Sequence, residues 1–113
     1  MFQFSPKSEA PEIFLDVKLL AGLTVKAGTK IELPAKITGK PEPQITWTKA
    51  EKLLRPDDRI TIETTPNHST VTITDSKRSD SGTYIIEAVN SSGRATAVVE
   101  VNVLGMHVLF LHY

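Results

Sequence analysis

The chain has 113 residues, and its 13 Lys and Arg residues balance its 13 Asp and Glu residues, so the formal net charge at pH 7 is zero. This length is typical of one domain with a single hydrophobic core. The balanced charge does not favour nucleic acid or an anionic membrane surface as a partner. Small domains of the secretory pathway normally use disulfides, and this sequence has no cysteine. Residues 1–11 also lack the features of a signal peptide, so we expect a soluble cytoplasmic protein.

Alternation of apolar and polar residues recurs along the chain, whereas helical periodicity is absent. Val, Ile and Thr dominate the alternating runs, as is typical of strands with one buried face. We expect strands near residues 12–16, 23–26, 30–38, 44–49, 58–63, 69–75, 82–90 and 93–103. Segments rich in Gly, Pro, Asn and Asp separate these runs and are typical of turns. Many short strands with regular turns predict an all-β sandwich or barrel.

Pro34 conflicts with its predicted surroundings. It lies inside the strand expected over residues 30–38, where proline has no N–H group to donate to the sheet. We therefore expect an irregular pairing at this point, with Pro34 facing a bulge or a partly unpaired neighbour.

Several motifs follow one another at the spacing of a single domain. In chain order they are residues 39–43 (GKPEP), 45–47 (ITW), 59–62 (RITI), 69–73 (STVTI), 80–84 (DSGTY) and 90–93 (NSSG). Each motif is weak by itself, but the ordered set resembles the intermediate-set (I-set) immunoglobulin domains of titin and other giant sarcomeric proteins, with most similarity to those of the A-band. The resemblance covers residues 11–104 and implies an immunoglobulin-like Greek-key β-sandwich.

The resemblance implies structural roles for particular residues. Ala35 and Ile86 stand where such a domain usually carries its inter-sheet disulfide, and Trp47 is expected to pack over both of them. Tyr84 corresponds to the tyrosine corner, where the hydroxyl bonds to the backbone a few residues upstream. Gly82 is expected to permit a close approach beside it.

One ion pair is also implied by the resemblance. Arg59 is expected to pair with Asp80 at the base of the sandwich, as in similar domains. In a partly buried position, such a pair is sensitive to the removal of either partner.

No catalytic, cofactor-binding or metal-binding site is expected, so the chain is not expected to be an enzyme. Ser81 lies beside Asp80, but the tyrosine corner accounts for both residues. His107 and His112 are five residues apart near the C-terminus, whereas a zinc site needs three or four ligands. His68 falls in a predicted turn and is expected to be solvated.

Two Asn-x-Ser patterns bear on the cellular compartment. They begin at Asn67 and Asn90, both in predicted turns, and either one is a glycosylation acceptor in a secreted protein. Asn and Ser are also the residues that turns favour. We prefer this second interpretation, because cysteine is absent.

The two ends differ from the rest of the chain. Residues 1–10 are expected to form a flexible lead-in, and residues 11–104 the domain. Residues 105–113 form an apolar tail that is too short to span a membrane, and the sequence assigns no function to it.

The resemblance implies a structural, mechanical and protein-docking module of a sarcomeric filament. Leu23 and Val25 are expected to pair in parallel with the last strand from Val99 through Val101 to Val103, so that force on the chain ends loads several hydrogen bonds in shear. The implied partners are neighbouring immunoglobulin and fibronectin-like modules, myosin and myosin-binding protein C, with the module itself monomeric. The alternatives are an extracellular adhesion or receptor module, and a module that flanks a muscle kinase.

Overall fold

The structure is a computed structural model that describes residues 8–105. Its elements are β1 (Glu9–Leu15), α1 (Val17–Leu20), β2 (Leu23–Lys26), β3 (Ile31–Lys40), β4 (Gln44–Lys49), β5 (Lys52–Leu53), β6 (Ile60–Thr65), β7 (His68–Ile73), the 3-10 helix η1 (Arg78–Asp80), β8 (Gly82–Asn90) and β9 (Gly93–Leu104). All the predicted strands are present. The sequence did not predict α1, β5 or η1, each of which has four residues or fewer. Within the described range, no helix is long and apolar enough to cross a membrane.

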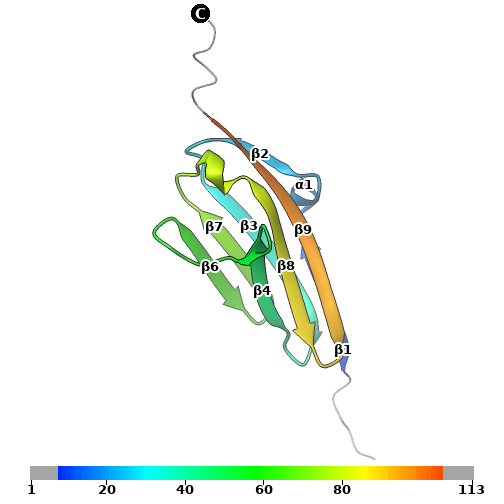
Figure 1. The fold of residues 1–113 in the computed structure, drawn as a ribbon. Coiled ribbons are helices and arrows are strands. Elements are labelled where there is room, and N and C mark those ends of the chain that lie inside the picture. The colour runs from blue at the N-terminus through cyan, green and yellow to red at the C-terminus, as the bar shows by residue number, and fades with distance from the viewer. Residues whose placement is uncertain (1–7, 106–113) are drawn as a thin grey trace, which may run out of the picture.

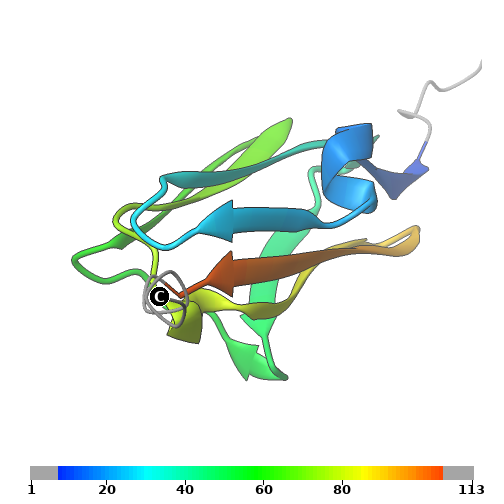
Figure 2. The ribbon, with the colours of Figure 1, turned by 90° about the horizontal axis from the view of Figure 1, so that it is seen from above.

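The strands form two sheets that pack face to face (Figure 1). One sheet has the order β1-β3-β7-β6 and the other the order β2-β9-β8-β4-β5. The parallel pair is β2 with β9, and these strands run side by side in the same direction in Figure 2. The remaining neighbours are antiparallel. The predicted all-β sandwich is therefore confirmed, and the absence of cysteine means that no disulfide joins the sheets.

The core lies between the two sheets and is built by the alternating residues that point inward. Its fully buried members come from both layers: Ile31, Leu33, Ala35 and Ile37 on β3, Val71 and Ile73 on β7, and Tyr84, Ile86, Ala88 and Val99 on β8 and β9. Removing this apolar surface from water is the main favourable term for a domain of this kind. Trp47 on β4 is 3% exposed and joins the same cluster.

The pairing around Pro34 is regular on one side of β3 and absent on the other. Pro34 lies opposite Thr70 in a continuous register with β7. On the other side the ladder with β1 ends where Leu15 lies opposite Ala35, one residue before Pro34. The expected bulge is therefore absent at this position, and a partly unpaired neighbour accounts for the proline.

The short helix α1 carries the chain from one sheet to the other after β1 ends. Asp16 caps it, because its side chain accepts a hydrogen bond of 2.9 Å from the backbone N–H of Lys18. Such capping is a preferred role of Asp. Within the helix, the side chain of Leu19 is buried, whereas those of Val17 and Leu20 are exposed.

Two residues of the β4–β5 hairpin have left-handed backbones. Ala50 has a φ of 53° and Glu51 a φ of 67°, and they link the paired residues Lys49 and Lys52. Two-residue hairpin turns favour this geometry, but Asn and Gly usually occupy it. The hairpin therefore carries backbone strain.

Candidate functional site

An ion pair and a buried tyrosine join three segments at one end of the sandwich. The Arg59 guanidinium contacts the Asp80 carboxylate through two bonds, Nη1 to Oδ2 at 2.9 Å and Nη2 to Oδ1 at 3.2 Å. The hydroxyl of Tyr84 donates a 2.6 Å hydrogen bond to the backbone carbonyl of Asp80. The structure thus brings together the residues that the sequence placed at the tyrosine corner and at the base of the sandwich.

The environment of this cluster changes the protonation of two groups. Burial acts to raise the pKa of Asp80, but hydrogen bonds from the Arg59 side chain and the Lys77 backbone outweigh it, so the pKa lies below its usual value. Burial raises the pKa of Tyr84 to about 12, and the nearby charge of Asp80 acts in the same direction. Both shifts favour the protonation states that make the observed hydrogen bonds.

The side chain of Lys49, on β4, contacts this cluster. Its Nζ donates to the backbone carbonyl of Ser79 and lies 5.6 Å from the centre of the Tyr84 ring, within the range of a cation–π contact. A Cβ atom at Gly82 would stand 3.1 Å from Lys49 Cε, and Gly82 has a φ of 152°. The absence of a side chain there permits the close approach.

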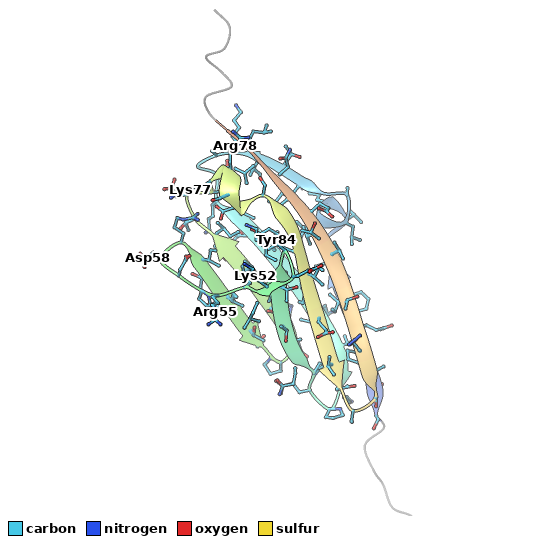
Figure 3. All side chains as sticks on the ribbon, viewed as in Figure 1. Lys52, Arg55, Asp58, Lys77, Arg78 and Tyr84 are labelled. Atoms are coloured by element: carbon cyan, nitrogen blue, oxygen red, sulfur yellow. The ribbon has the colours of Figure 1, made fainter. Side chains whose placement is uncertain are left out.

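Charged side chains surround this end of the molecule. Figure 3 shows Lys77 and Arg78 at η1, and Arg55 and Asp58 on the segment between β5 and β6. The charges have both signs, and Arg59 and Asp80 already neutralise each other. Three of these four labelled side chains are cationic.

A side-chain hydrogen bond inside the core also joins the two sheets. Trp47 and Ile86 lie opposite each other on β4 and β8, while Ala35 and Ser69 lie opposite each other on β3 and β7. The indole Nε1 of Trp47 donates a 2.9 Å hydrogen bond to Ser69 Oγ. Ser69 was not predicted from the sequence as a residue with a particular role. A signal was available, because Ser69 is a polar residue at an inward position of an alternating strand.

The parallel ladder of β2 with β9 covers Val101 to Leu104, the C-terminal part of the range that the sequence indicated and one residue beyond it. Leu23 lies opposite Val101 and Val25 opposite Val103. Val99 lies opposite Tyr84 on β8 and is not among the β9 residues that pair with β2. One backbone hydrogen bond, of 2.9 Å from Ala27 N–H to Leu104 oxygen, continues the ladder.

Backbone direction identifies which β2 residues bond to β9. N–H groups on one side of a strand alternate with groups on the other side. Because the Ala27 N–H points to β9, those of Val25 and Leu23 point there too, and that of Thr24 points away. The ladder is formed by strands close to the two ends of the domain.

The residues considered for catalysis and metal binding have other surroundings. Ser81 Oγ accepts a 2.8 Å hydrogen bond from the Val103 N–H. His68 is exposed at the start of β7, whereas His107 and His112 lie outside the described residues. Within residues 8–105, no three His, Asp or Glu side chains are grouped as metal ligands.

Asn90 has a structural role that the sequence did not reveal. Its Nδ2 donates to the carbonyls of Glu9 and Pro41, at 2.8 and 2.9 Å. Its Oδ1 accepts from the backbone N–H groups of Ser92 and Gly93. Both amide hydrogens are in use, so a glycan on Nδ2 would break at least one of these bonds.

The comparison with known families decides the identity of the fold. The family described as "Immunoglobulin I-set domain" matches residues 16–103. The chain is an immunoglobulin I-set domain. This I-set domain is 38% identical over 81 residues to the CAVP-target protein of Branchiostoma lanceolatum, a match that covers 72% of this chain and 33% of the relative.

Further similarities link this I-set domain to proteins of striated muscle. It is 33% identical over 106 residues to fast-type myosin-binding protein C of Gallus gallus, covering 90% of this chain and 9% of the relative. A solved structure of a chimeric titin Z1Z2 superposes with a TM-score of 0.77 at 25% identity, covering 88% of this chain and 98% of that chain. The I-set domain thus spans a third or less of the two curated relatives.

Proposed function

We propose that this I-set domain is a structural, force-resisting and protein-docking module of a sarcomeric filament protein. The observation that carries the proposal is the parallel ladder between β2 and β9. The described chain begins near one end of the long axis and β9 finishes at the other (Figure 1). Tension applied through the two ends therefore runs along the ladder.

The direction of the ladder determines how it responds to tension. Its hydrogen bonds lie across the strands, so force along the strands loads them together in shear. A hairpin pulled at its open end loses its bonds one at a time. Resistance to force depends on the unfolding barrier, and the shear geometry raises that barrier.

Two pulling geometries on the same chain test this proposal. Because the chain has no native cysteine, Asp58→Cys with Thr74→Cys supplies unique attachment points at the open end of the β6–β7 hairpin. We expect the unfolding force through the chain ends to exceed the force that opens this hairpin. Equal forces in the two directions would contradict a mechanical role for the ladder.

The relatives support the proposed docking role and a sarcomeric location. Because similar domains occur in myosin-binding protein C and titin, we propose neighbouring immunoglobulin and fibronectin-like modules, myosin and myosin-binding protein C as partners. We place the module in the A-band of the sarcomere. An antibody against the domain, used on striated-muscle lysate, tests whether the module is part of a filament. A band in the megadalton range supports a titin-like filament, and a band near 12.4 kDa contradicts one.

A further inference from the structure

The edge of β3 is open where β1 ends. The Ile37 N–H donates to the Asn67 carbonyl at 2.8 Å, on the β7 side. Because backbone groups alternate in direction, the N–H and C=O of Glu32 and the C=O of Pro34 point to the opposite side. The β1 ladder ends at the pair of Leu15 with Ala35. Within residues 8–105, no strand therefore pairs with this part of the β3 edge.

A pocket lies beside this open edge. It is lined by Asp16, Lys18, Leu19, Leu23, Glu32 and Pro34, with a volume of about 260 Å³. Pockets for small molecules usually measure roughly 300–1,000 Å³, so this one suits a side chain better than a whole ligand. The opposite wall comes from α1 and β2, and Leu19 and Leu23 make it apolar.

The charges of the lining favour a cation. Two acidic residues and one basic residue are among the residues that line the pocket, so their formal charge is −1. Lys30 approaches Glu32 at 3.7 Å, but both side chains are about 60% exposed, and such pairs are weak.

We propose that this open edge binds an extended segment of a partner protein that carries an aliphatic residue next to a lysine or arginine. The segment continues the line of β1 and bonds to the free groups of Glu32 and Pro34, as in β-strand addition. Neighbouring side chains of a strand point to opposite faces. The aliphatic side chain then enters the pocket against Leu19 and Leu23, and its basic neighbour lies on the face of Glu32.

Hydrogen exchange of the free chain tests the first premise. The Glu32 amide has no strand partner, whereas the Leu33 amide bonds to β7. We expect the Glu32 amide to exchange at least tenfold faster than that of Leu33. Equal protection of both amides would overturn the inference, because the edge would then be closed.

Binding is tested by NMR on the isotopically labelled chain with a capped peptide that has Val-Lys-Val at its centre. We expect shifts in the Glu32 amide and in the methyl groups of Leu19 and Leu23. The same peptide with an N-methyl group on each central residue should lose the effect. Shifts confined to another edge such as β6, or no shifts at millimolar peptide, would overturn the proposal.

A charge exchange supplies the matched control. Glu32 is exposed, so Glu32→Lys leaves the fold intact, and it should weaken binding of the Val-Lys-Val peptide about threefold. The corresponding Val-Glu-Val peptide should gain affinity for Glu32→Lys by a similar factor. Pro34→Ala adds an N–H to the open edge and should tighten binding of both peptides. Insensitivity to both substitutions would contradict the proposed site.

The proposed peptide-binding edge of β3 rests on the docking part of the proposed function. Separate experiments nevertheless disprove the binding edge and the mechanical role. Loss of peptide binding with high unfolding force would remove only this surface. Low unfolding force with intact peptide binding would remove only the mechanical role.

Discussion

The Trp47 indole N–H and the Ser69 hydroxyl form a 2.9 Å hydrogen bond that joins the two sheets inside the core. Ser69 lies opposite Ala35, and Trp47 lies opposite Ile86. The bond therefore occupies the level at which the positions of the usual disulfide face each other. A polar contact and close packing stand there in place of a covalent link.

Ser69→Ala removes the acceptor of this bond and leaves a buried indole donor without a partner. We expect the free energy of unfolding to fall by about 1–3 kcal/mol, as measured by urea denaturation. Thr64→Val is the matched control, because Thr64 Oγ contacts the same hydroxyl at 2.9 Å from a more exposed position. A denaturation midpoint for Ser69→Ala equal to that of the wild type would show that the bond contributes nothing.

Asp80→Asn should reduce the loss of stability at acid pH. The pKa of Asp80 is lower in the folded chain than in the unfolded chain, so its contribution is present above the unfolded value of about 3.9 and disappears as the pH falls through the folded value. Thermal unfolding at a series of pH values below 5 measures this slope. The same slope in the variant and the wild type would rule out Asp80 as a main source.

Tyr84→Phe tests how the stability of the fold depends on pH under alkaline conditions. The pKa of Tyr84 is raised to about 12, so the folded chain retains a proton that the unfolded chain loses near pH 10. The stability of the wild type should therefore fall as the pH rises from about 10 to 12. Tyr84→Phe should weaken that dependence and, at neutral pH, lower the free energy of unfolding by about 1 kcal/mol through the lost hydrogen bond to Asp80. Denaturation curves at pH 7 and pH 11 distinguish the two effects, and an unchanged pH dependence would refute the assignment.

The β4–β5 turn offers a stabilising change. Ala50→Asn with Glu51→Gly places the preferred residues at φ values of 53° and 67° and should raise the free energy of unfolding by about 1 kcal/mol. Lys52→Gly is the control, because glycine in a strand should lower stability. If the double variant is less stable than the wild type, the turn is not strained in the way its geometry indicates.

The strands were predictable because their inward residues alternate over long runs, as on β3 and β9. The helix α1 and the strand β5 were not, because four and two residues are too few for any periodicity to appear. Ser69 and Asn90 were missed for another reason. Their partners on other segments, Trp47 for Ser69 and Glu9 and Pro41 for Asn90, lie 22 or more residues away along the chain, and local patterns do not contain such distances.

The mechanical residues show the same limit. Alternation placed Leu23, Val25, Val99 and Val101 on strands, but it does not fix which residues face each other. The register is set by the path of the chain through α1 and by the packing of both sheets. This is why Val101 and Val103, and not Val99, lie opposite β2.

The most direct test of the central claim is the unfolding force of Val25→Pro when single molecules are pulled through the chain ends. The substitution deletes an N–H group that points to β9. Thr24→Pro is the matched control, because it deletes the N–H of the neighbouring residue, which points away from β9. We predict a clear drop in unfolding force for Val25→Pro and a much smaller change for Thr24→Pro. An unfolding force for Val25→Pro equal to that of the wild type would contradict the role of the β2–β9 ladder in bearing force.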